Sequence, residues 1–129
     1  MKLLLDTHIW LWSQLEPGRL GRRVRHLLDE ETSELWLSPI SAWEAWLLNA
    51  KGRINLTPEP ATWIEKATRS LHEATLTHEI VIAAQQLALP HADPADRFLA
   101  ATAQVLGLTL VTADQKLLGL GDIATHANR

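Results

Sequence analysis

Two carboxylates in the stretch HADPADRFLAATA, residues 91–103, are the first residues whose chemistry needs an explanation. Asp93 and Asp96 lie three positions apart in front of an apolar run, and carboxylate oxygens are the ligands that magnesium prefers in proteins. The same residues also suit the start of a helix. An aspartate caps free backbone amides, proline fits the first helical position, and an acid in the first turn complements the helix dipole. Stability alone therefore explains the pair, unless other acids lie nearby in the fold.

Two more aspartates follow short apolar segments. Asp6 ends the run of residues 2–5, and Asp114 follows the segment LTLVTA. Either aspartate could cap a helix that begins at the next residue. For each residue taken alone, a structural role and a functional role therefore fit the sequence about equally well.

Glu44 lies in the segment SPISAWE, where local structure gives it no role. A capping box would need Ser41 as the helix cap, with Glu44 three positions later. Ser38 followed by Pro39 makes a better helix start, because it uses proline in the first turn. That start places Glu44 in the second turn, out of capping reach and among apolar neighbours. We therefore favour a functional role for Glu44.

The hydrophobic pattern predicts an α/β fold. Short apolar runs bounded by polar residues indicate strands at residues 2–5, ELWLSP, ATLTHE and LTLVTAD. Segments with helical spacing lie between them, at residues 8–15, 19–30, 39–51, 60–70, 79–88 and 94–106. Gly107 is expected to end the last of these helices, and GRINLTPEP to be a surface connection. This alternation predicts a parallel sheet covered by helices on both faces, with right-handed crossovers.

The predicted sheet brings the separate acids together. In an open parallel sheet, the carboxyl ends of the strands and the starts of the following helices share one edge. Carboxylates held close together do not all stay ionised comfortably unless a cation lies among them. The sequence therefore predicts a metal site at this edge. His8 and His91 lie close to Asp6 and Asp93 in sequence, but without the spacing of a helical zinc pair we expect them to be loop residues.

Composition limits the class of protein. With 129 residues, 47% of them hydrophobic, the chain is expected to form one domain over residues 1–129. The absence of cysteine excludes disulfides and thiolate metal sites and fits a cytoplasmic protein. Asp6 interrupts the first apolar run before a signal peptide could form, and no apolar stretch is long enough to span a membrane.

Positive charge is uneven within a formal net charge of −3. The segment RLGRRVRHLL gathers four arginines, Arg19, Arg22, Arg23 and Arg25. Such a segment can follow a phosphate backbone, but it is more often the solvated face of a helix, and we favour the second interpretation.

Six tryptophans give a further indication of partner binding. Trp43 and Trp46 share a helix face, whereas Trp10 and Trp12 point in different directions on theirs. At least one tryptophan is therefore expected to be partly exposed. Plain packing and a partner surface are both compatible with this pattern.

Together, the segments LLLDTH, SPISAWE, DPADRFLAATA and LTLVTAD resemble the motifs of the PIN domain, in particular those of the VapC toxins of toxin-antitoxin pairs. The resemblance covers nearly the whole chain, and the order and spacing of the short motifs make it fairly specific. It implies a PIN-like three-layer α/β/α sandwich with a central, mostly parallel sheet of four or five strands. It also implies a metal-dependent endoribonuclease that is inhibited by a cognate antitoxin and forms a homodimer.

The resemblance implies roles for individual residues. The residues that match the family's acidic quartet, which holds magnesium or manganese and carries out catalysis, are Asp6, Glu44, Asp96 and Asp114. Thr112 matches the supporting hydroxyl, and we interpret Asp93 as a helix cap first and a metal support second. Arg97 or the arginine-rich segment would contact substrate phosphate. The main alternative is a noncatalytic member of the same fold that binds protein or RNA.

Overall fold

A parallel sheet forms the centre of the fold in this computed structural model, which describes residues 1–89 and 93–129. The described part contains one five-stranded sheet in the order β3-β2-β1-β4-β5. Its strands are β1 (Lys2–Leu5), β2 (Glu34–Leu37), β3 (His72–Glu73), β4 (Thr109–Thr112) and β5 (Thr125–Ala127). Every neighbouring pair is parallel, which confirms the predicted α/β class and its mostly parallel sheet.

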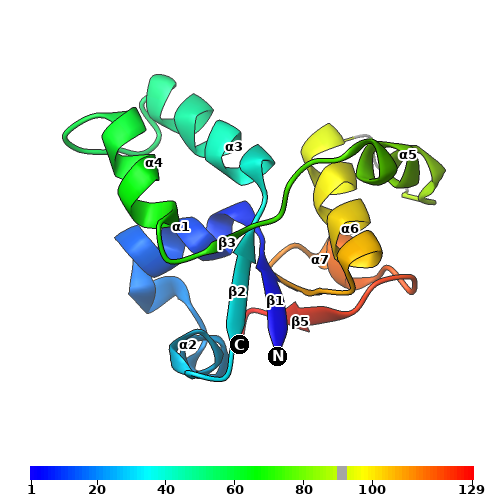
Figure 1. The fold of residues 1–129 in the computed structure, drawn as a ribbon. Coiled ribbons are helices and arrows are strands. Elements are labelled where there is room, and N and C mark those ends of the chain that lie inside the picture. The colour runs from blue at the N-terminus through cyan, green and yellow to red at the C-terminus, as the bar shows by residue number, and fades with distance from the viewer. Residues whose placement is uncertain (90–92) are drawn as a thin grey trace.

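Helices cover both faces of the sheet, as Figure 1 shows. On one face lie α1 (Thr7–Leu15), the short 3-10 helix η1 (Pro17–Arg19), α2 (Arg22–Asp29), α3 (Pro39–Ala50) and α4 (Pro60–Thr68). On the other face lie α5 (His78–Gln86), α6 (Pro94–Leu106) and α7 (Gln115–Leu118). The three-layer arrangement expected from the sequence is therefore confirmed.

The alternation of side chains along β1 explains the two helical layers. Leu3 and Leu5 belong to a hydrophobic cluster with Trp10 of α1, whereas Leu4 belongs to a second cluster with Ile80 of α5. Each of the three leucines is almost completely buried. Burying a leucine side chain contributes about 1.5–3 kcal/mol relative to leaving it exposed, so this one strand anchors both layers.

Local sequence sets the boundaries of the helices that border the site. Ser38 caps α3 by accepting a hydrogen bond from the Ile40 N–H at 3.1 Å, and Pro39 occupies the first turn. Gly107 ends α6 with a φ of 65°, a conformation that glycine adopts without steric cost. Both predicted boundaries are confirmed.

The structure differs from the predicted elements at the sheet edges. The third strand was expected in ATLTHE, but β3 lies just before it, at His72–Glu73. Thr77, inside the expected strand, accepts a hydrogen bond from the Ile80 N–H and caps α5, so the chain leaves the sheet early. The elements η1, α7 and β5 were not predicted, because three or four residues are too few to show a period.

The carboxyl ends of the strands form one edge of the sheet. There β1 leads into α1, β2 into α3 and β4 into α7, and α6 packs beside α3. The N-terminus lies at the opposite edge, beside the start of β2, and the C-terminus lies against the start of α2 (Figure 1). Within the described residues, no helix has the length and apolar character needed to cross a membrane.

Candidate active site

Five acidic side chains line one cleft of about 300 Å³ at the carboxyl edge of the sheet. They are Asp6 after β1, Glu44 in α3, Asp93 and Asp96 at the start of α6, and Asp114 before α7. His8, Trp12 and Ala113 complete the lining. The expectation that His8 is a loop residue is wrong, because it lies in the first turn of α1, and His91 lies outside the described residues. The sequence predicted that these acids converge, and the geometry confirms it. Their roles as metal ligands and catalytic groups stay predictions.

Asp6 is buried, with only 9% of its surface exposed, and both of its carboxylate oxygens accept hydrogen bonds. The Thr7 N–H donates to Oδ1 at 2.8 Å, and the Thr112 hydroxyl on the neighbouring strand β4 donates to Oδ2 at 2.6 Å. Burial raises the pKa of Asp6 because it disfavours the charged form. The two hydrogen bonds and the nearby His8 act against this shift, and the negative charge of Asp114 adds to it.

Thr112 supports two of the acids at once. While its hydroxyl donates to Asp6, its oxygen accepts a hydrogen bond from the Asp114 N–H at 3.0 Å. It therefore fixes the start of the loop that carries Asp114 relative to β1. This geometry fits the supporting role predicted for Thr112.

Glu44 is held by residues of α1 rather than by its own helix. The Thr7 hydroxyl donates a hydrogen bond to Glu44 Oε1 at 2.5 Å and also lies 2.8 Å from the Ser41 hydroxyl. Because a hydroxyl carries one proton, Thr7 accepts from Ser41 when it donates to Glu44. Partial burial raises the pKa of Glu44, and the charges of Asp6, Asp93 and Asp96 raise it further, against the hydrogen bond from Thr7. Glu44 therefore carries its negative charge at an energetic cost.

Sequence reasoning missed Thr7 and Ser41. Thr7 follows Asp6 directly in LLLDTH, and Ser41 lies one turn before Glu44, so a polar residue beside each acid was the available signal. Both side chains are buried, and the bonds between them depend on the packing of α1 against α3. Sequence spacing alone does not reveal such packing.

Asp93 and Asp114 cap the helices that follow them. Asp93 accepts a hydrogen bond from the Ala95 N–H at 3.0 Å, and Asp114 accepts one from the Lys116 N–H at 2.9 Å. The structural role considered for each residue is therefore present. Asp96 lies in the first turn of α6, half-buried at the cleft, where its charge adds to the negative potential around Glu44.

The donor set of the cleft fits a hydrated magnesium or manganese ion. Among the described residues, no three Asp, Glu or His side chains lie close enough together to surround an ion directly. Carboxylate oxygens are nevertheless the preferred ligands of these ions, and magnesium usually keeps several of its waters. Burial raises the pKa of Asp6 and of the half-buried Glu44, and repulsion from the neighbouring acids adds to both shifts. A cation bound among the carboxylates would offset both effects. Asp6, Glu44, Asp96 and Asp114, with Asp93 beside them, would hold the ion.

Arg97 has a structural role that the sequence did not reveal. Its guanidinium Nη1 donates hydrogen bonds to the backbone carbonyls of Ala84 at 3.0 Å and Leu87 at 3.3 Å. These carbonyls lie at the end of α5, where helical acceptors lack partners within the helix. Arg97 thus ties the end of α5 to the first turn of α6, one residue after Asp96. A contact of Arg97 with phosphate would compete with these bonds.

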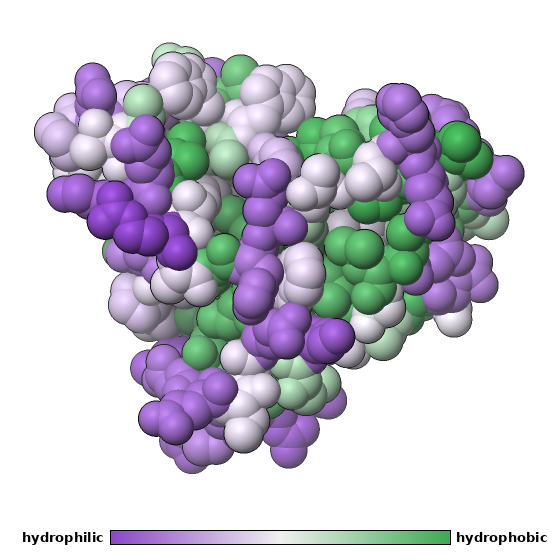
Figure 2. All heavy atoms as spheres, viewed as in Figure 1, coloured by the Kyte–Doolittle hydropathy of each residue, from purple (hydrophilic) through white to green (hydrophobic). Residues whose placement is uncertain are grey.

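The arginines of the arginine-rich segment lie outside the residues that line the cleft. Arg22, Arg23 and Arg25 are exposed on α2, whose Val24 N–H donates to the Arg129 carbonyl at 3.0 Å, beside the chain ends. In Figure 2 the lower part of the molecule, where Figure 1 shows α2, is mainly hydrophilic. The solvated helix face favoured from the sequence is confirmed for these three residues. Arg19 instead lies over the Trp12 ring, 4.4 Å from its centroid.

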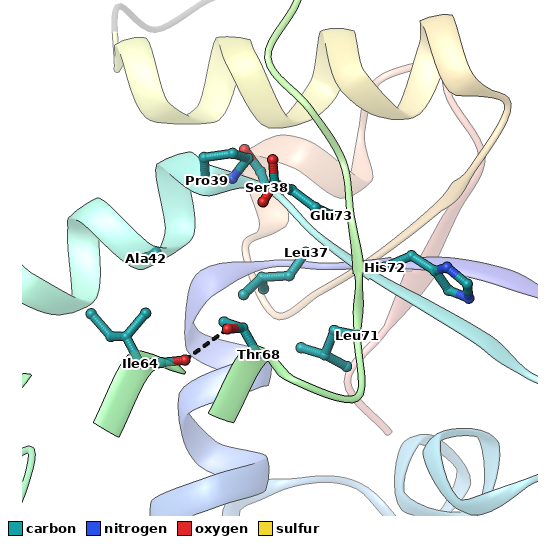
Figure 3. Close-up of a pocket in the computed structure, with 9 residues that line it drawn as sticks. All are labelled: Leu37, Ser38, Pro39, Ala42, Ile64, Thr68, Leu71, His72 and Glu73. Atoms are coloured by element: carbon teal, nitrogen blue, oxygen red, sulfur yellow. Dashed lines mark hydrogen bonds between the residues drawn. The ribbon is translucent and has the colours of Figure 1, made fainter. Parts of the chain in front are cut away.

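A second depression, of about 240 Å³, is different in character (Figure 3). It lies between the start of α3, the end of α4 and β3, and most of its lining side chains are apolar. Its residues include Leu37, Ile64, Leu71 and a single carboxylate, Glu73. One isolated acid does not provide the donor set of the cleft, so the candidate active site is the acidic one.

Comparisons with known proteins agree with this geometry. Residues 3–122 match the PIN domain. The chain is 35% identical over 119 residues to Ribonuclease VapC22 from Mycobacterium tuberculosis (strain ATCC 25618 / H37Rv), covering 89% of this chain and 88% of the relative.

Solved structures of similar fold come from toxin-antitoxin complexes. DNA-bound VapBC from Salmonella typhimurium matches with a TM-score of 0.78 and 18% identity, over 100% of this chain and 99% of the other. VapBC2 from Rickettsia felis, bound to a DNA fragment from its promoter, matches with a TM-score of 0.76 and 13% identity, over 98% of both chains. These two likenesses show the fold, and the sequence matches show the family. The chain therefore belongs to the PIN domain family and to its VapC branch.

Proposed function

We propose that the protein is a magnesium- or manganese-dependent endoribonuclease that acts as the toxin of a toxin-antitoxin pair. The observation that carries the proposal is the cleft lined by five carboxylates, among which the fold buries Asp6 and half-buries Glu44 although burial raises their pKa. The relative from Mycobacterium tuberculosis is named a ribonuclease, and the structural neighbours are VapBC complexes, which supports both parts of the proposal.

The buried acids would act in hydrolysis of a phosphodiester bond. A bound divalent cation lowers the pKa of a water molecule and offsets negative charge on the phosphate. Glu44 is the group suited to orient the attacking water or to accept its proton, because its carboxylate lies in the cleft and is fixed there by the Thr7 hydroxyl. Thr7 orients Glu44, and Thr112 orients Asp6, through the hydrogen bonds described above.

The proposed partners are RNA as substrate, a cognate antitoxin as inhibitor and a second copy of the chain in a homodimer. We place the activity in the cytoplasm, where such a substrate is found. The antitoxin would neutralise the toxin by covering the acidic cleft, and a cationic side chain would suit the five carboxylates there.

A noncatalytic binding module is the second candidate. It is favoured by one observation, that no three acidic or histidine side chains among the described residues lie close enough together to surround an ion directly. Such a module would bind its partner without metal and would leave RNA intact.

One assay separates the two candidates. Purified protein is incubated with single-stranded RNA in magnesium, in manganese or in excess chelator, beside Glu44→Gln prepared in the same way. Glu73→Gln is the matched control, because Glu73 lies in the apolar depression rather than in the cleft. We expect metal-dependent cleavage by the unsubstituted protein and by Glu73→Gln, and little by Glu44→Gln. Cleavage that continues unchanged in chelator, or equally in Glu44→Gln, would contradict the proposal.

A further inference from the structure

A large aromatic side chain lies beside the acidic cleft without being buried. Trp43 on α3 is 57% exposed and immediately precedes Glu44. It helps to line a depression of about 250 Å³ between α3 and the start of α6. This depression shares His8, Glu44 and Asp93 with the acidic cleft. The two are therefore parts of one groove that runs from the carboxylates past Trp43.

The charge of the groove changes along α3. Glu44 and Lys51 both line it: Glu44 lies in α3, and Lys51, seven positions later, is the residue that caps the end of this helix. Seven residues make almost two turns, so both side chains leave the same side of α3, about 10 Å apart along its axis. Apolar side chains of Leu47 and Leu48 lie between them in the lining. The groove thus has carboxylates at one end, an aromatic and apolar stretch in the middle and a cation at the other end.

From this order of groups we infer that Trp43 forms a stacking platform for a nucleobase of single-stranded RNA, next to the bond that is cleaved. The inference rests on the proposed ribonuclease function. A strand with one phosphate at the acidic cleft presents a flat base to the aromatic stretch and a further phosphate to Lys51. Stacking of bases on aromatic side chains and contact of phosphates with lysine are the usual means of binding single strands without sequence readout.

Charge favours RNA over a second copy of the chain as the occupant. A symmetric contact between two copies through this groove would bring together two rims that each carry Glu44 and Asp93. Lys51 by contrast complements a phosphate.

The inference is tested by steady-state cleavage of a short fluorescent single-stranded RNA in manganese. Trp43→Ala is compared with Trp43→Phe, which keeps an aromatic face. Trp46→Ala is the matched control, because Trp46 lies on the same helix and is 47% exposed but does not line the groove. We expect Trp43→Ala to raise KM about 5- to 100-fold with a smaller change in kcat. Trp43→Phe should keep most of the affinity, and Trp46→Ala should leave KM unchanged.

Each other result has a distinct meaning. Normal cleavage by the unsubstituted protein together with an unchanged KM in Trp43→Ala overturns this inference alone. A change in molecular mass by sedimentation for Trp43→Ala, with KM unchanged, assigns Trp43 to contact between two copies and also overturns it. Absence of cleavage by the unsubstituted protein overturns the proposed function first, and the inference with it.

Discussion

Two kinds of carboxylate line the same cleft. The capping acids, Asp93 and Asp114, accept hydrogen bonds from the backbone of the helices that they begin. The buried acids, Asp6 and the half-buried Glu44, accept hydrogen bonds from the hydroxyls of Thr112 and Thr7, which belong to other elements. Burial raises the pKa of both buried acids.

This difference distinguishes the acids that helix capping explains from those that it does not. A capping carboxylate stabilises its helix, so local structure alone explains Asp93 and Asp114. Glu44 caps nothing, and the fold holds it near other negative charges. Asp6 also caps α1, but an exposed carboxylate at that position would cap the helix while keeping its hydration. A bound cation is the simplest reason for keeping these two acids where they are.

The largest expected effect is a difference in cleavage rate between substitutions of the two acids in the segment DPAD. We predict that Asp96→Asn lowers the rate of RNA cleavage on the order of 100-fold or more, because loss of even an indirect support of a metal site costs 10- to 100-fold. Asp93→Asn should retain most of the activity, because asparagine caps a helix as well as aspartate does. Initial rates in manganese measure both. Equal losses in the two variants would show that Asp93 does more than cap α6, and would contradict the distinction between Asp93 and Asp96.

The next effect concerns the support of that helix start. Replacing Arg97 by leucine removes the hydrogen bonds to the carbonyls of Ala84 and Leu87, so we predict a loss of about 1–3 kcal/mol in unfolding free energy. Arg97→Lys keeps the positive charge but loses the planar fork, and it should also be destabilised. Urea denaturation of both variants tests this. If Arg97→Lys is fully stable and cleavage alone is impaired, Arg97 contacts phosphate instead.

A smaller effect tests whether Asp114 is both a cap and a ligand. Asp114→Ala should lose about 0.5–2 kcal/mol of stability, whereas Asp114→Asn should stay close to the unsubstituted protein, because it keeps a capping oxygen. Both substitutions should reduce cleavage if the carboxylate also supports the metal. Full activity in Asp114→Asn would leave capping as its single role.

Sequence could predict the parts of the fold that depend on local signals. The alternation in LLLD places β1 between two helical layers, and proline, caps and Gly107 set the limits of α3 and α6. The short element α7 and the displaced strand β3 could not be predicted, because their positions depend on pairing and capping rather than on periodicity.

The position of the acids in the site could also be predicted from the sequence. Strand ends and helix starts share an edge, so the acids could be placed in one cleft from sequence order alone. The hydrogen bonds of Thr7 and of Arg97 could not be predicted, because they depend on the packing of α1 against α3 and of α5 against α6. The acids of the cleft and the supporting Thr112 could therefore be predicted from the sequence, whereas Thr7 and the structural role of Arg97 could not.

Thermal unfolding of Glu44→Gln, in chelator and in manganese, tests the central claim most directly. Glutamine keeps an oxygen for the Thr7 hydroxyl and removes the charge, so in chelator the variant should melt at the same temperature as the unsubstituted protein or higher. Manganese at 100 times its Kd should stabilise the unsubstituted protein by about 2.7 kcal/mol, roughly 10 °C, and the variant by much less. A variant that melts lower in chelator and gains as much from manganese would contradict a metal role for the buried acids.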